Sequence, residues 1–409
     1  MPQSDAHALF DRGHAALQSG DFREAVECFT RSIAIRGDVA VAYRARAKAY
    51  AGLNQRTLAI TDLDRAVKLE PESAQIRAER AGELLKQKDY RGVIADCEAA
   101  MRLDPGRGDV YGLRAAAYAD NGQTERAFAD YAKALEADPD NAHQFYTARA
   151  RLLYQLERFG EVIADADAAL SLVPDFTPAL ELRASARQHT DDFAGAQTDY
   201  AAAQAQDPKS LGSIMGLGLL AYQQKRWADV VGAADKLLAV IPGMPQAYEM
   251  RAGGRWELGD RAGAIADVTL ALAREPNRVS SLSLRGMYHA NDGQYAAAVR
   301  DHLDALKQDP HSASSFNSLA WLWATAPDPD IRNGRRAKEC ATRACELSEF
   351  QNPTHLDSLA AAHAELGEFA HAAQWQAKAL ALVPDAERET YAARRALYER
   401  GEPFRTATV

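Results

Sequence analysis

Long apolar runs are missing from this 409-residue sequence, and none approaches the roughly 18 residues that a membrane-spanning helix needs. The first residues, MPQSDAHALFDRGHAAL, also lack the basic start and the apolar stretch of a signal peptide. Cysteine is scarce, with four residues in the whole chain, so a disulfide framework is excluded. We therefore expect a cytoplasmic protein that does not insert into membranes and keeps its thiols reduced.

Positive charge is in deficit as well. The chain has 48 Lys and Arg against 57 Asp and Glu, a formal net charge of −9. Non-specific binding to nucleic acid or to anionic lipid needs clustered basic residues, so neither partner is expected. A nucleic-acid binder, the alternative of this class, would show an affinity that falls steeply with salt.

The residue patterns of common catalytic and cofactor sites are absent too. The ten histidines form no His-Glu-x-x-His helix, there is no Cys-x-x-Cys pair, and no Gly-x-x-x-x-Gly-Lys-Ser/Thr loop occurs. Gly216 and Gly218 fall inside an expected helix, where Gly218 serves close packing. We can place no Ser/His or Cys/His arrangement, so we predict a non-enzyme without cofactor or metal.

What the sequence does contain is a repeat of 34 residues. A proline recurs at this spacing, with one step of 35, at Pro71, Pro105, Pro139, Pro174, Pro208, Pro242, Pro276 and Pro310. In the unit Gly108–Asn141, apolar residues follow helical spacing on both sides of a turn at Asn121-Gly122. Each half of about a dozen residues is too short to be stable alone, so it must pack against its partner and its neighbours.

This pattern resembles the tetratricopeptide repeat (TPR). The residues that carry the resemblance are Tyr111, Ala115, Tyr118, Ala127, Tyr131, Ala134 and Pro139. The resemblance implies an all-α fold, a right-handed α-solenoid of about eleven helix-turn-helix units with a C-terminal capping helix. It also implies a concave groove that binds a protein or peptide, in the manner of a scaffold. The alternative is a regulatory sensor whose superhelix changes shape when a peptide or an anion binds.

The expected organisation follows from the repeat boundaries. We expect flexible residues 1–5 and 401–409, a capping helix at 386–400, and a loop inserted at 324–334 within the tenth unit. The eleven units are 6–39, 40–73, 74–107, 108–142, 143–176, 177–210, 211–244, 245–278, 279–312, 313–352 and 353–385.

Two charged positions occur together within units. Arg stands at position 7 of eight units, and seven of these have Asp at position 23, as in Arg114 and Asp130. Units 7, 10 and 11 have Leu217, Leu319 and Leu359 instead and lack the Asp. We predict an ion pair between the two helices of a unit, with leucine as an apolar substitute; the alternative is two independently solvated charges.

The face opposite the packing stripe supplies the candidate binding residues, because the resemblance assigns that face to the groove. They are Arg44, Lys48, Arg151, Tyr154, Met215, Tyr222, Glu249, Trp256, Met287 and Trp321. Units 2 and 3 are basic there, whereas units 6 to 11 present Glu181, Glu249, Glu257, Asp357 and Glu365. We expect a ligand with basic groups beside apolar anchors. The alternative for Trp256 and Trp321 is that they fill gaps between successive helices.

A minor candidate is an anion site at the inserted loop. Arg332, Arg335 and Arg336 are expected at the start of a helix, where the helix dipole opposes positive charge. The alternative is a loop neutralised by its own Asp328 and Asp330.

Overall fold

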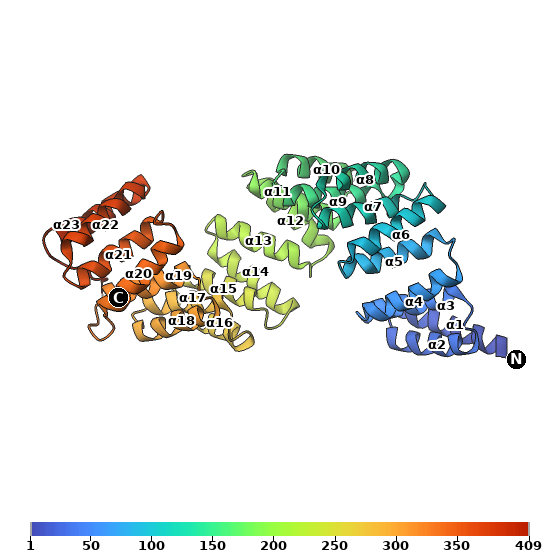
Figure 1. Ribbon diagram of the computed structural model, residues 1–409, viewed down its shortest axis with the longest axis horizontal. Coiled ribbons are helices and arrows are strands. Elements are labelled where there is room, and N and C mark those ends of the chain that lie inside the picture. Colours follow the sequence, from blue (N-terminus) through green and yellow to red (C-terminus); the bar gives the residue numbers. More distant parts are fainter. Residues whose placement is uncertain (1, 408–409) are drawn as a thin grey trace. The chain divides into compact units, whose positions relative to one another are not determined.

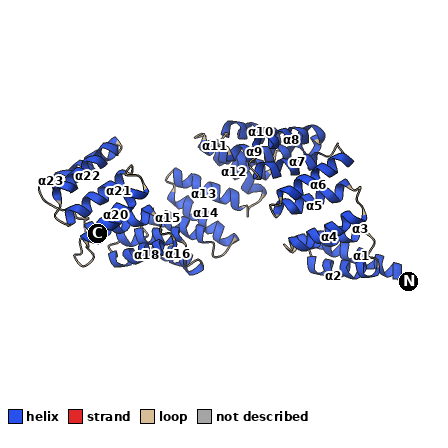
Figure 2. Cartoon of the chain, in the orientation of Figure 1, coloured by secondary structure: helices blue, strands red, loops and turns tan. Residues whose placement is uncertain are grey.

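The computed structural model describes residues 2–407, and every regular element in that range is a helix (Figure 2). The chain divides between Pro208 and Lys209 into two compact parts, called here the N-terminal half and the C-terminal half. Both halves are built from antiparallel helical hairpins, visible in Figure 1 as successive pairs of coils. In each hairpin the odd-numbered helix is called the A helix and the even-numbered one the B helix.

The N-terminal half contains six hairpins and one 3₁₀ helix in its described residues. Their bounds are α1 Pro2–Ser19, α2 Phe22–Ile35, α3 Ala40–Gly52, α4 Arg56–Leu69, α5 Ala74–Lys86, α6 Tyr90–Leu103, α7 Gly108–Asp120, α8 Thr124–Ala137, η1 Pro139–Asn141, α9 Ala142–Gln155, α10 Phe159–Leu172, α11 Thr177–His189 and α12 Phe193–Gln206.

The C-terminal half contains five hairpins followed by a last helix in its described residues. Their bounds are α13 Leu211–Gln223, α14 Trp227–Val240, α15 Pro245–Glu257, α16 Arg261–Arg274, α17 Val279–Asn291, α18 Tyr295–Gln308, α19 Ala313–Thr325, α20 Gly334–Leu347, α21 Pro353–Glu365, α22 Phe369–Leu382, η2 Asp385–Glu387 and α23 Arg388–Glu399.

The predicted fold class is confirmed. The chain is all-α, and within each half the hairpins stack side by side, as in an α-solenoid, with α23 after the eleventh hairpin. Helix α1 begins at Pro2, before the expected start of the first unit at residue 6. The expected capping helix at 386–400 corresponds to η2 and α23.

The turn inside a hairpin usually has one residue in the left-handed region. Ten of the eleven repeats have positive φ there, at Gly20, Asn54, Lys88, Gly122, Glu157, Asp191, Lys225, Gly259, Gly293 and Gly367. Five of these are not glycine, although a side chain makes this conformation costly. The turn geometry is therefore dictated by the packing of the two helices and not by glycine alone.

The predicted Arg–Asp ion pair is confirmed in all seven repeats that carry both residues. Arg114 Nε and one terminal nitrogen bind the two oxygens of Asp130 at 2.6 and 2.8 Å, and Asp130 is only 3% exposed. The equivalent pairs are Arg46–Asp62, Arg80–Asp96, Arg149–Asp165, Arg183–Asp199, Arg251–Asp267 and Arg285–Asp301. In the first repeat, Arg12 pairs with Glu24 instead and stays largely exposed.

Some of these arginines also reach the preceding repeat, which the sequence did not predict. The third nitrogen of Arg80 lies 2.7 Å from Asp64, and Arg183 and Arg251 make the same contact with Asp167 and Asp235. The acceptor stands at position 25 of the earlier repeat. One guanidinium thus connects both helices of its own hairpin with the B helix of the neighbour.

The inserted loop of the tenth repeat and the C-terminal tail both contact Glu365. Arg332 of the loop donates to the carbonyl oxygens of Ala326 and Pro327, both at 2.8 Å, and its Nε lies 3.3 Å from Glu365. Arg405 of the tail pairs with the same Glu365, and the amide of Thr406 donates to Thr325 at 3.0 Å. Residues 404–406 thus pack on α19 and α21, which differs from the flexible tail expected from the sequence. Residues 408 and 409 lie outside the described range.

Candidate functional site

Two basic candidates of the N-terminal half, Arg44 and Lys48, are neutralised by a residue that the sequence analysis did not consider. Arg44 of α3 binds Glu79 of α5 through two nitrogens, one of them 2.8 Å from Oε2, and Lys48 Nζ lies 3.6 Å from the same carboxylate. Burial alone would raise the pKa of Glu79, but the hydrogen bonds and charge of Arg44 lower it. The expected positive surface of repeats 2 and 3 is therefore largely cancelled.

The other two candidates of this half lie on α9. Arg151 lines a cavity of about 230 Å³ together with Asp120 and Tyr131. The hydroxyl of Tyr154 is 2.9 Å from Nε2 of His189 on α11, so this side chain is engaged between neighbouring hairpins.

Three candidates of the C-terminal half, Glu249, Met215 and Tyr222, do not come together in one site. Glu249 of α15 accepts hydrogen bonds from Arg278 at 2.8 Å and from Ser280 at 2.7 Å, and so holds the start of α17. Met215 packs in an apolar cluster of α13, α14 and α15. Tyr222 is 51% exposed and touches Trp227 edge-on, with ring centroids 5.1 Å apart.

Trp256 stacks on the ring of Tyr288, with centroids 4.3 Å apart and an interplanar angle of 11°. Tyr288 belongs to α17, so the indole fills the space between two successive A helices. This is the packing role that the sequence analysis gave as the alternative to a binding role.

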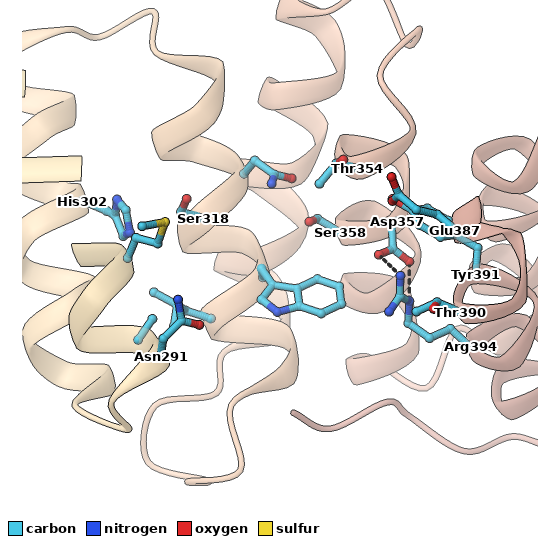
Figure 3. Close-up of a pocket in the computed structure, with 15 residues that line it drawn as sticks. Asn291, His302, Ser318, Thr354, Asp357, Ser358, Glu387, Thr390, Tyr391 and Arg394 are labelled. Atoms are coloured by element: carbon cyan, nitrogen blue, oxygen red, sulfur yellow. Dashed lines mark hydrogen bonds and ion pairs between the residues drawn. The ribbon is translucent and has the colours of Figure 1, made fainter. Parts of the chain in front are cut away.

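Met287 and Trp321, by contrast, are brought together in a pocket of about 420 Å³ (Figure 3). Figure 3 shows His302 and Asn291 on one side of the pocket and Asp357, Tyr391 and Arg394 on the other. The remaining lining residues are Ala290, Asn317, Ser318, Leu322, Thr354, Ser358, Glu387 and Thr390. The walls thus come from the last three repeats and from α23.

Three polar atoms of the pocket are buried without a hydrogen-bond partner among the described residues. They are Nδ1 of His302, Oδ1 of Asn317 and Oγ of Ser358, from α18, α19 and α21. Ser358 is 0% exposed and His302 is 3% exposed. Burial lowers the pKa of His302 to about 4, so the imidazole is neutral near pH 7. Leaving such a group unpaired costs about 1–3 kcal/mol of folding free energy.

A buried ion pair forms the wall of the pocket on the side of α23. Asp357 is 3% exposed and accepts hydrogen bonds from Arg394 at 2.9 Å and from Gln376 at 2.7 Å. Burial raises the pKa of Asp357, and the charge of Arg394 and the two hydrogen bonds counteract part of this rise. The guanidinium lies 5.5 Å from the ring centroid of Trp321 and 4.8 Å from that of Tyr391. Helix α23 was expected to act only as a cap, yet it contributes Thr390, Tyr391 and Arg394 to the pocket.

The helix face that the sequence analysis assigned to a groove has fewer unpaired acidic groups than expected. Three of the five carboxylates expected to make repeats 6 to 11 acidic have an arginine partner. These pairs are Glu249–Arg278, Asp357–Arg394 and Glu365–Arg332. Their partners lie 29, 37 and 33 residues away, on other elements, which is why the pattern of A helices did not reveal them.

The loop arginines do not converge on one place. Arg332 is occupied by loop carbonyl oxygens and Glu365, as described above. Arg336 lies over the ring of Trp323 at 5.7 Å, and Arg335 is exposed. The geometry gives no support to an anion site formed by all three.

Two family models described as tetratricopeptide repeat match the chain. One covers residues 6–38 and 108–141, and the other covers residues 44–107 and 250–327. The chain is a tetratricopeptide repeat protein. Such repeats mediate protein–protein interactions and are typically not catalytic themselves.

Among curated proteins, this TPR protein is similar to the tetratricopeptide repeat and J domain-containing co-chaperone DNJ1 of Fusarium oxysporum f. sp. lycopersici. The two are 29% identical over 167 residues, which is 39% of this chain and 32% of the relative. The matched segment thus amounts to about a third of the relative's length.

Solved structures give similar matches. For yeast Tom70 the identity is 12% and the TM-score 0.48, covering 98% of this chain and 96% of that chain. For Pseudomonas aeruginosa PilF the identity is 14% and the TM-score 0.47, covering 53% of this chain and 97% of that chain.

Within residues 2–407 of this TPR protein, no helix has both the length and the hydropathy required to cross a bilayer.

Proposed function

We propose that this TPR protein binds a short peptide segment in the pocket formed by α17, α19, α21 and α23. The observation that carries the proposal is an open cavity of about 420 Å³ in which Met287 and Trp321 lie beside accessible polar residues, namely Asn291, Asn317 and Thr354. An apolar cavity would not need such groups, whereas ligand pockets combine apolar walls with a few polar atoms that fix orientation.

A peptide has the matching chemistry. Its main chain offers an N–H donor and a C=O acceptor at almost every residue, so it can bond to the accessible side chains of Asn291 and Thr354 in turn. An apolar side chain of the same segment would lie against Trp321 and Met287, and truncating such an anchor commonly costs about 2 kcal/mol or more.

The charge balance favours a segment that is uncharged where it enters the pocket. Asp357 and Arg394 compensate each other, which leaves exposed Glu387 at the margin. We therefore expect affinity to depend only weakly on salt, because exposed rim charges contribute little to binding. The sequence analysis expected a ligand with basic groups, because it treated the acidic residues as unpaired; we now propose an uncharged segment instead.

The test uses peptides selected from a random display library with the full-length protein. Their dissociation constants are measured for the wild type and for Trp321→Ala, Ser358→Ala and Tyr222→Ala, with helicity monitored by circular dichroism. Tyr222 is the matched control, because it is an exposed aromatic on an A helix outside the pocket.

We expect Trp321→Ala to weaken binding at least roughly tenfold and Tyr222→Ala to leave it unchanged. Ser358→Ala should leave binding unchanged while stabilising the free protein slightly, since it removes an unpartnered hydroxyl that is fully buried. Selected peptides that bind the wild type and folded Trp321→Ala equally would show that the pocket is not the binding site.

A further inference from the structure

A second cluster of side chains lies outside the pocket, at the turn between α21 and α22. It consists of His363 near the end of α21, Glu368 at the N-cap of α22 and His371 in the first turn of α22. One potential ligand atom from each residue lies within 4.8 Å of the other two. His363 Nδ1 is hydrogen-bonded to Oε2 of Glu368, and the two imidazole centroids are 5.4 Å apart.

The turn geometry creates this grouping. Gly367 has φ of +77° and reverses the chain between α21 and α22. Glu368 and His371, five and eight residues after His363, therefore meet it at one end of the hairpin. The three residues belong to two helices and the turn between them, so they do not lie on one face of a single helix. For this reason the search for helical metal motifs in the sequence missed them.

A cation already lies beside the carboxylate. Lys338 of α20 donates to Oε2 of Glu368 at 2.8 Å, and both side chains are more than a third exposed. An exposed pair of this kind contributes little to stability, so its ammonium can be displaced at small cost.

We propose that His363, Glu368 and His371 form a binding site for a divalent transition-metal ion of the zinc type. Two imidazoles and one carboxylate are a common zinc ligand set, which leaves a fourth position for water or for a group from a partner. Zinc–ligand distances of about 2.0–2.2 Å require the three atoms to move somewhat closer. His363 is 7% exposed and fixed, whereas exposed His371 and partly exposed Glu368 are free to adjust.

Isothermal titration of the full-length protein with Zn²⁺, under reducing conditions, tests the site. We expect Glu368→Gln and His371→Ala each to weaken binding at least roughly tenfold, since each removes a ligand. Neither change should unfold the protein, because Glu368 makes no side-chain cap bond and His371 is exposed.

Two further variants separate this site from adventitious binding. Lys338→Met removes the competing ammonium and should tighten Zn²⁺ binding several-fold, whereas His311→Ala, at an exposed histidine of another turn, should have no effect. The proposal is overturned if the wild type binds no Zn²⁺, or if Glu368→Gln and His371→Ala bind it as tightly as the wild type. Co²⁺ absorption then reports the coordination geometry, and a spectrum dominated by thiolate charge transfer would place the ion on the cysteines instead.

Discussion

Replacing one arginine of the repeated ion pair should lower the free energy of unfolding, by an amount that depends on whether its aspartate partner is kept or replaced as well. Arg114→Leu leaves the carboxylate of Asp130 without either of its two guanidinium bonds. Asp130 is 3% exposed, so water cannot replace them. Removing one member of a buried pair in this way typically costs about 3–5 kcal/mol.

The double variant should recover most of that loss. Arg114→Leu with Asp130→Ala reproduces the combination that repeat 7 already contains, Leu217 with Ala233. In repeats 10 and 11 the corresponding Leu319 and Leu359 are buried, which shows that leucine fits this site. Since a buried ion pair and an apolar replacement are often close in energy, we expect the double variant to lie within about 1–2 kcal/mol of the wild type.

The assay must be local, because a repeat array opens in parts and a single unfolding free energy is poorly defined. Native-state hydrogen exchange of amides in α8 reports the opening free energy of that hairpin for the four members of the mutant cycle. Arg12→Leu is the matched control, since Arg12 and Glu24 have 65% and 37% of their side chains exposed. It should cost much less than Arg114→Leu, because solvent screens an exposed pair. A coupling energy near zero, or equal losses for Arg12→Leu and Arg114→Leu, would refute the reasoning.

Three further outcomes are expected. The unfolded chain protonates histidine near pH 6.5 and the folded chain protonates His302 only near pH 4, so lowering the pH through this window should destabilise the protein by up to roughly 3 kcal/mol. His302→Phe would place a phenylalanine against Gly286, as Phe29 lies against Gly13 in the first repeat, and should remove the pH-dependent part of stability that His302 causes. Urea midpoints measured against pH check this, and a pH dependence equal to that of the wild type would contradict it. Glu157→Gly, at φ of +57°, should raise the melting temperature because it relieves about 1 kcal/mol of strain, whereas Ala132→Gly within α8 should lower it. A chain ending at Glu402 loses the Arg405 and Thr406 contacts, so amides of residues 326–333 should exchange faster; unchanged protection there would mean that the tail does not hold the loop.

The sequence predicted features that recur and missed those that occur once. The hairpins, the turns and the pairing of Arg114 with Asp130 repeat along the chain, so each copy supports the same interpretation. The pocket depends on Arg394 reaching Asp357 across 37 residues, and the neutralisation of Arg44 depends on Glu79. No period marks such contacts, because they join residues of different repeats or of the terminal helix. Trp321 was found from its unusual position, but the same reasoning also selected Trp256, whose stacking on Tyr288 only the coordinates reveal.

The bridge from position 7 to position 25 of the preceding repeat makes neighbours specific to one another. Arg80, Arg183 and Arg251 each find an aspartate there, whereas Arg149 faces a repeat that has Ala132 at this place. Exchanging or duplicating modules would therefore change the charge balance at any junction where an arginine loses or gains its preceding aspartate, even where each module keeps its own helices intact. In an array of this kind the order of the repeats is itself part of the encoded information, and recombination between repeats is constrained by which acid precedes which arginine.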